Sequence, residues 1–118
     1  MYNKVVLIGR LTKDPDSRMT ASGIPLTRFT LAIDRSGGRE NKVTDFLNIV
    51  TWRRTAEIAS QFLKKGKLIA IEGSLRIDTY EKNGQIREWV EVVADNLQML
   101  DRQTDSFTQE EPQFQTTQ

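Results

Sequence analysis

Two long β-rich segments joined by an Asn-Gly pair restrict the fold of this sequence more than any other feature. Residues 67–80 and 86–99 are rich in Ile, Val, Thr and aromatic residues, and Asn83-Gly84 lies between them. The tightest hairpin turns need a positive φ at both central residues, which Asn and Gly adopt more readily than other residues. The sequence therefore predicts one long antiparallel hairpin.

Three further strands and one short extended piece are predicted before this hairpin. Residues 5–11 are apolar on both parities, so we expect both faces of this strand to be buried. Residues 28–34 alternate between apolar and polar, and residues 43–52 form the next β-rich run. A glycine-centred, charged loop joins them at residues 35–42. Residues 18–20 form the short extended piece between two turn signals.

One helix is predicted, over residues 55–65. Thr55 is its expected N-cap, Lys64 and Lys65 suit its carboxyl end, and Gly66 is its expected stop. Its apolar stripe consists of Ile58, Ala59, Phe62 and Leu63.

Five strands with one helix between the third and fourth are typical of the five-stranded oligonucleotide/oligosaccharide-binding (OB) barrel. We therefore predict an all-β fold with one helix, with hairpin arms that extend beyond the barrel. The predicted domain spans residues 1–102. Residues 103–118 read QTDSFTQEEPQFQTTQ, without an aliphatic residue, and are predicted to be a disordered, mildly acidic tail.

The composition excludes several kinds of chemistry. The chain contains no Cys and no His, which removes disulfides, Cys/His zinc sites, thiol nucleophiles and Ser-His-Asp relays. The net charge of +1 is a sum over unlike parts: residues 1–100 hold sixteen basic and twelve acidic residues, a net +4, whereas residues 101–118 hold one and four, a net −3. No apolar run is long enough for a signal peptide or a membrane span, so we expect no membrane association.

Aromatic residues on two segments are the candidate binding groups. In the third strand, one parity holds Phe46, Asn48, Val50 and Trp52, and the other holds Leu47 and Ile49. Either Leu47 and Ile49 or Phe46, Val50 and Trp52 form the core face. Parity alone leaves open which of the two sets points out of the barrel.

The hairpin favours the outward alternative for its own aromatic residues. A two-residue turn places Tyr80 opposite Arg87 and Asp78 opposite Trp89, so that two aromatic rings share a face with arginines. The predicted core face of the same hairpin consists of Ile77, Thr79, Val90 and Val92.

Aromatic rings interleaved with basic groups suit unpaired nucleic acid, because bases stack on the rings while cations follow the phosphates. The candidate phosphate-binding residues are Lys4, Arg10, Arg28, Arg35, Arg53, Arg76 and Arg87. A rival enzymatic interpretation uses the carboxylates as metal ligands for hydrolysis, but no spacing resembles a metal loop. We therefore predict a binding protein with no catalytic residue, metal or cofactor.

Residues 3–100 resemble the bacterial single-stranded DNA-binding proteins, specifically a short-tailed member. The segments that carry the resemblance are NKVVLIGRL at 3–11, Asp14-Pro15, FLNIVTWR at 46–53, FLKKG at 62–66, IEGSLR at 71–76, VVAD at 92–95 and Met99-Leu100. Each is weak alone, and their order and spacing make the assignment.

The resemblance implies a cytoplasmic, nucleoid-associated homotetramer that binds and protects single-stranded DNA in replication, recombination and repair. It also implies stacking by Phe46, Trp52 and Tyr80, to which the hairpin adds Trp89, and it leaves the loop at 35–42 to act through Arg35, Arg39 and Lys42. The family's recruiting tail ends in an acidic cluster followed by Ile-Pro-Phe, whereas this chain ends in EEPQFQTTQ, a diluted version for contacting replication or repair proteins. The alternative is an accessory module of the primosomal type that acts mainly through protein contacts.

Overall fold

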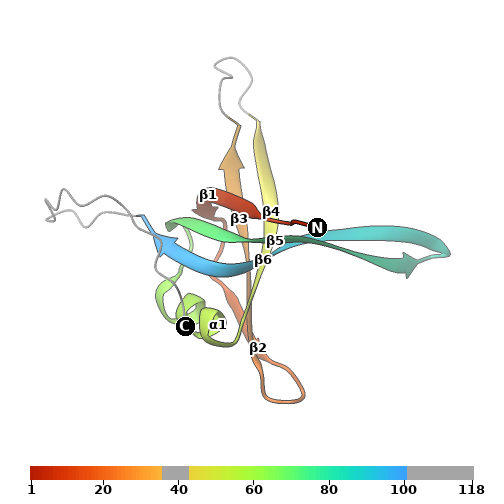
Figure 1. Cartoon of the computed structure of the whole chain (residues 1–118), viewed down its shortest axis with the longest axis horizontal. Coiled ribbons are helices and arrows are strands. Elements are labelled where there is room, and N and C mark those ends of the chain that lie inside the picture. The colour runs from red at the N-terminus through yellow and green to blue at the C-terminus, as the bar shows by residue number, and fades with distance from the viewer. Residues whose placement is uncertain (36–42, 101–118) are drawn as a thin grey trace, which may run out of the picture.

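The computed structural model describes residues 1–35 and 43–100 (Figure 1). Within these residues the chain forms six strands and one helix. The ends of the predicted segments differ from those of the observed elements by three residues or fewer. The elements are β1 Val5–Leu11, β2 Asp16–Met19, β3 Pro25–Asp34, β4 Thr44–Trp52, α1 Arg53–Phe62, β5 Leu68–Lys82 and β6 Gln85–Met99.

The strands form one sheet that closes on itself. Their order is β1-β5-β6-β4-β3-β2, and β1 also pairs with β3 through Arg10 with Ala32 and Leu11 with Leu31. All pairs are antiparallel except β4 with β6. This arrangement, with α1 between β4 and β5, confirms the OB-type fold. The additional strand β2 is the short piece predicted near residues 18–20, which pairs along β3.

The core lies inside the closed sheet. Leu31, Ile49, Ile69 and Ile71 are completely buried, and Ala59 of α1 and Leu63, directly after the helix, belong to the same cluster. Val5 and Leu7 pack against it from β1, so the inward face of this strand is covered as predicted. The outward face is not: Val6 is 53% and Ile8 55% exposed in the single chain.

The ends of the helix differ from the prediction. Helix α1 begins at Arg53, directly after β4, and no side chain caps it. The assignment of Thr55 as N-cap is wrong: its hydroxyl is buried and donates to the carbonyl oxygen of Asp95, which joins α1 to β6. The helix ends at Phe62, so Lys64, Lys65 and Gly66 lie in the following turn, and Phe62 is an exposed member of the predicted stripe.

The β5–β6 hairpin is longer than the barrel is tall. Its turn is the predicted one, with Lys82 opposite Gln85 and positive φ at Asn83 and Gly84. The outer halves of both strands leave the barrel as an arm, at the right of Figure 1.

The arm corrects part of the predicted core. Val92 is buried, but Ile77 is 53% and Val90 41% exposed, and Thr79 is also exposed. These three residues have the parity of core residues, but no second layer of this chain covers them where the arm extends past the barrel.

Parts of the sequence-based prediction fall outside the described residues. Arg39, Lys42 and most of the loop at 35–42 are among them, as is the tail at 103–118. The domain boundary at residue 102 therefore stays a prediction.

Gly73 sits at a bulge that the barrel wall requires. The β5–β6 register shifts between Glu72 and Gly73, and a Cβ at Gly73 would lie 1.9 Å from the carbonyl oxygen of Val93. Because the obstacle is backbone, Gly73→Ala should lower the free energy of unfolding by about 3 kcal/mol, measured by urea denaturation. Ser74→Ala on the same strand should cost less than about 1 kcal/mol. Equal losses for the two variants would contradict this account.

Candidate nucleic-acid interface

The sheet of β3 and β4 has one face in the core and one outside. Ile49 is completely buried and Leu47 packs against the core, so Phe46, which has the opposite parity on β4, points outward. Val50 shares the parity of Phe46 but is buried, at 1% exposed. Phe46 is accordingly 65% exposed, and Trp52 is partly exposed at the other end of the strand. The structure thus places the Phe46 ring outward and leaves Trp52 partly exposed, whereas Val50 between them is buried. We call this surface of β3 and β4 the outer face.

The base of the arm adjoins the outer face. Asn48 of β4 pairs with Glu91 of β6, and two residues earlier on β6 Trp89 has the same parity as Glu91. The indole Nε1 of Trp89 donates to Glu91 Oε2 at 3.2 Å. Tyr80 lies farther out on the arm, opposite Arg87 as predicted, and its ring is exposed.

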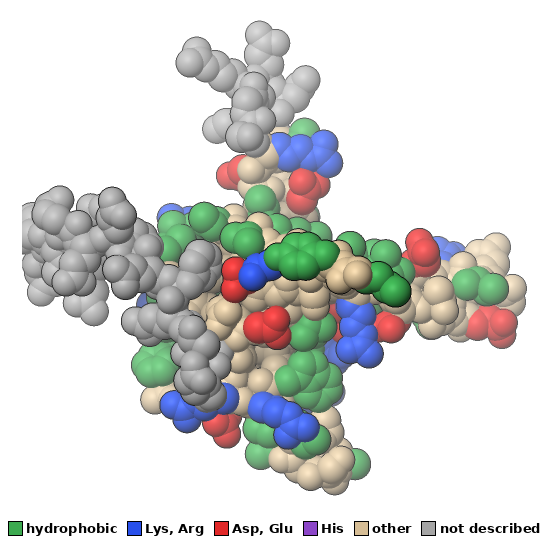
Figure 2. Space-filling view, viewed as in Figure 1, with side chains coloured by type: hydrophobic (Ala, Val, Ile, Leu, Met, Phe, Trp, Pro, Cys, Tyr) green, Lys and Arg blue, Asp and Glu red, His purple; other side chains and the backbone are tan. Residues whose placement is uncertain are grey.

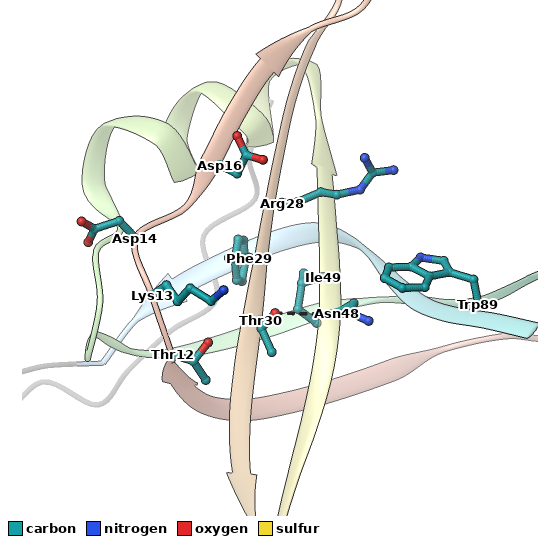
Figure 3. A pocket seen from close by; sticks show the side chains of 10 residues that line it. All are labelled: Thr12, Lys13, Asp14, Asp16, Arg28, Phe29, Thr30, Asn48, Ile49 and Trp89. Atoms are coloured by element: carbon teal, nitrogen blue, oxygen red, sulfur yellow. Dashed lines mark hydrogen bonds between the residues drawn. The ribbon is translucent and has the colours of Figure 1, made fainter.

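A hollow of about 210 Å³ lies between the outer face and the arm (Figure 3). Arg28 and Thr30 of β3 line it together with Asn48 of β4, Trp89 stands at one end, and Lys13 from the β1–β2 connection lines the other side. The Thr30 hydroxyl donates to Asn48 Oδ1 at 3.3 Å. Residues far apart in the sequence, among them the apolar Phe29 and Ile49, thus form one concave surface beside an exposed indole.

Most of the predicted phosphate-binding cations contact protein acceptors. Arg28 lies 3.5 Å from Glu91 and Arg76 lies 3.6 Å from Asp78, in both cases through Nε. Arg10 donates to the carbonyl oxygen of Gly66 at 2.9 Å, and Arg87 donates to the side chain of Gln85 at 3.3 Å.

Two tighter pairs change protonation equilibria. The Lys4 ammonium lies 3.0 Å from Glu72; the hydrogen bond between them raises the pKa of Lys4 and lowers the pKa of Glu72, which the Asn96 amide lowers further. Arg35 binds Asp45 with two hydrogen bonds of 3.0 Å, which raise the pKa of Arg35 and lower the pKa of Asp45.

The structure brings only some of the predicted site residues together. Arg28 and Arg76 both flank Glu91, Arg28 through its ion pair and Arg76 as the partner of Glu91 across the hairpin. Arg53 directly follows Trp52 at the start of α1, where its φ of +57° is strained for a residue with a side chain. Lys4 and Arg10 lie on the β1 side of the barrel, and Arg35 is tied to Asp45, whose parity is opposite to that of Phe46.

Sequence reasoning missed four residues of this surface: Lys13, Thr30, Asn48 and Glu91. Asn48 had a usable signal, because it shares the parity of Phe46 and Trp52. Glu91 has the parity of Trp89, which indicates the outer face of the arm and pairing with arginines, but its contact with Arg28 depends on how β3, β4 and β6 meet in space. Lys13 had no such signal.

Two features are absent from the described part of the chain. Within residues 1–35 and 43–100, no three acidic side chains lie close enough to hold a metal ion. In the same part of the chain, no helix has the length and apolar character needed to cross a membrane.

Comparisons with known proteins agree on one family. The Single-strand binding protein family matches residues 2–100. The chain is 49% identical to the single-stranded DNA-binding protein of Caldanaerobacter subterraneus over 86% of this chain and 69% of that protein. It is 48% identical to single-stranded DNA-binding protein A of Bacillus subtilis over 86% of this chain and 60% of that protein, and 43% identical to the Thermotoga maritima protein over 93% and 84%.

A solved structure supports the same relationship. The Plasmodium falciparum SSB complex with ssDNA superimposes with a TM-score of 0.79 at 26% sequence identity. The match covers 86% of this chain and 96% of that one.

Removing the Arg35 guanidinium should remove the main cause of the low pKa of the Asp45 carboxyl. In Arg35→Gln the pKa of Asp45 should rise, as measured by NMR titration of side-chain carboxyl resonances. The stabilisation from this pair exists above the unfolded Asp pKa of about 3.9 and is lost as pH falls through the lower folded value. The pKa of Glu72, held low by Lys4, should not move; a shift of both would point to a global change instead.

Proposed function

Because the chain belongs to the single-strand binding protein family, we propose that it binds and protects single-stranded DNA with little regard to sequence. The proposed setting is the cytoplasm, in association with the nucleoid, during replication, recombination and repair. The protein acts as a binding protein, not an enzyme.

The outward orientation of Phe46 carries this proposal. An aromatic ring that is 65% exposed on a barrel wall gains nothing from the core of its own chain. Phe46 and Trp52 lie six residues apart on one strand, about 20 Å at 3.3 Å per residue, so two bases can stack at separate points along one path. Stacking on aromatic rings contributes about 1–3 kcal/mol per base and tolerates any base.

The cations near the outer face supply the second component of DNA binding, contact with the phosphates. Arg28 and Arg76 are held near carboxylates at 3.5 and 3.6 Å, which is loose for charge-assisted hydrogen bonds. A phosphate can take the place of Asp78, which is exposed, beside Arg76. Glu91 is buried, so a phosphate would bind the terminal N–H groups of Arg28 while Nε stays near Glu91. The surface therefore suits a backbone of phosphates, whose binding weakens as salt rises.

We also propose that the chain assembles into a homo-oligomer, a tetramer by family resemblance. The support in this chain is the outward face of β1, where Val6 and Ile8 are more than half exposed on a regular strand. Figure 2 shows exposed hydrophobic side chains in this region and along the base of the arm. A second copy would cover them, which is the burial that the sequence of β1 predicted.

Loss of one stacking ring should weaken DNA binding without unfolding the protein. Phe46→Ala and Tyr80→Ala should each reduce affinity for an oligothymidylate by about 5- to 100-fold, because each removes one stacked base. Fluorescence titration gives the affinity and circular dichroism the fold. Phe62→Ala, an exposed ring on α1, serves as the matched control and should bind normally.

Two outcomes would contradict this assignment. Equal affinity for duplex DNA of the same length would exclude recognition of unpaired bases. Unchanged DNA affinity in Phe46→Ala and Trp52→Ala, combined with weaker binding to a replication or priming protein, would favour the accessory-module alternative.

The β1 face can be tested separately from DNA binding. Ile8→Glu places a charge on the exposed face and should reduce the mass measured by light scattering, since a buried unpaired carboxylate is costly. Met19→Glu on β2 is also an exposed apolar-to-acidic change and should leave the mass unaltered. A wild-type protein that is monomeric with and without DNA would exclude the oligomer.

A further inference from the structure

Strand β2 has an open edge. It is the last strand of the sheet, and within the described residues no second strand pairs with its outer side. All four of its residues are exposed, and the Met19 side chain is 69% exposed. An unpaired edge presents a row of main-chain N–H and C=O groups, so it can pair with one more extended segment.

The hairpin between β2 and β3 shows which residues present these groups. Directly after β2, the Thr20 N–H donates to the carbonyl oxygen of Ile24 at 3.0 Å, so the main-chain groups of Thr20 face the β3 side. Such groups alternate between the two edges of an antiparallel strand. Those of Arg18 therefore also face β3, whereas those of Ser17 and Met19 face the open edge. The pairing of Met19 with a proline of β3 agrees, because proline has no N–H to donate.

A groove of about 400 Å³ runs along this open edge, between β2 and α1. Figure 1 shows the two elements side by side at the bottom of the view. From β2 the groove is lined by Ser17, Arg18 and Met19. From α1 it is lined by Ala56, Glu57, Ser60 and Gln61.

The floor of the groove is closed. Thr27 is 1% exposed, and its hydroxyl donates to the carbonyl oxygen of Ala56 at 2.9 Å. The Ser17 hydroxyl lies 3.1 Å from the Thr27 hydroxyl. These polar groups are paired with one another, so the groups that an occupant would pair with are the main-chain groups along the β2 edge.

The lining side chains favour an uncharged segment that carries one apolar ring. Arg18 and Glu57 bring one charge of each sign, which together select neither an acidic nor a basic peptide. Apolar surface comes from Met19, Pro25 and Ala56, and the other lining side chains carry hydroxyl and amide groups. Such groups pair with hydroxyl and amide side chains of an occupant.

Residues 112–118 of this chain have that composition and can reach the groove. They read PQFQTTQ, with no charge and one ring, at Phe114. The described chain ends at Leu100, whose N–H donates to the carbonyl oxygen of Leu68 at 2.9 Å. Gln61, which lines the groove, is seven residues before Leu68 and so at most about 25 Å from it. The segment that joins Leu100 to residue 112 spans up to about 40 Å.

From these observations we propose that residues 112–118 bind in the groove as an added strand on the edge of β2, with the Phe114 ring against its apolar side. The added strand pairs with the main-chain groups of Ser17 and Met19, the way in which an extended peptide joins an exposed sheet edge. The groove shares no lining residue with the hollow beside Trp89, so this docking site is separate from that hollow. The inference does not depend on DNA binding and is tested without DNA.

Modest affinity is sufficient for this docking. A segment on a short flexible tether meets its site at an effective concentration of about 1 mM. A site with a dissociation constant of about 0.1 mM is then occupied in about nine molecules of ten.

Amide hydrogen exchange of the full chain, followed by NMR, tests the added strand. The Ser17 and Met19 amides should exchange about tenfold faster in Phe114→Ala than in the wild-type protein, because the ring that anchors the strand is lost. The Arg18 amide is the internal control, since it faces β3 and should exchange equally in both proteins. Phe107→Ala removes the other ring of residues 101–118 and should leave all three amides unchanged. Equal exchange of Ser17 and Met19 in wild type and Phe114→Ala overturns the inference.

The absence of cysteine allows an independent test by disulfide formation. Ser60→Cys combined with Thr116→Cys, which shares the parity of Phe114, should give an intrachain disulfide under mild oxidation, detected by non-reducing electrophoresis and mass spectrometry. Phe62→Cys with Thr116→Cys is the matched control, because residue 62 is exposed on the same helix but does not line the groove. Its disulfide should form about tenfold more slowly, since only the free tether then brings the thiols together.

The rates and products of the two cysteine pairs decide the result. Adding Phe114→Ala to the Ser60→Cys, Thr116→Cys pair should lower its rate to that of the control. Equal rates for the two pairs in the presence of Phe114 exclude docking in the groove. Disulfides that join two chains would assign the groove to residues 112–118 of a second copy and overturn the intrachain proposal.

Discussion

The length of the β5–β6 hairpin relative to the barrel is the constraint on which the rest of this structure depends. Its inner half forms the barrel wall and needs the bulge at Gly73, where the backbone of Val93 leaves no room for a side chain. Its outer half continues in the same register as an arm beyond the core. Trp89 lies where the wall becomes the arm, so the hollow exists because the hairpin leaves the barrel at that point.

Local patterns predicted the elements well and their surroundings less well. The bounds of β1, the Asn83-Gly84 turn and the cross-strand pairs of the hairpin follow from side-chain type and turn chemistry, which act over a few residues. The start of α1 could not be predicted in this way, because the Thr55 side chain, which suits an N-cap, instead donates a hydrogen bond to the Asp95 carbonyl oxygen on another strand. Ile77 and Val90 have core parity without a core to cover them, since alternation reports a face but not what lies against it.

The candidate site shows the same limit. The sequence predicts that Phe46 and Leu47 lie on opposite faces of the strand. Only the family resemblance, and then the closed sheet, indicated that Phe46 is the one that points out. Asn48 could have been chosen from its parity. Glu91 shares the outward parity of Trp89, but its burial between an indole and a guanidinium could not be predicted, because it requires β3 and β6 to be placed on either side of β4.

The pairing of cations with carboxylates affects how much phosphate contacts and base stacking each contribute to DNA binding. Lys4, Arg28, Arg35 and Arg76 each lie within 4 Å of a carboxylate, so a phosphate that reaches them competes with an existing partner. The local gain per cation is therefore smaller than for a free guanidinium, while the net +4 of residues 1–100 still attracts a strand at longer range. The rings of Phe46 and Tyr80 are exposed among the described residues and offer a stacking surface without displacing a charged partner there. Once the strand has arrived, stacking on Phe46, Trp52 and Tyr80 should hold it more firmly than the phosphates do.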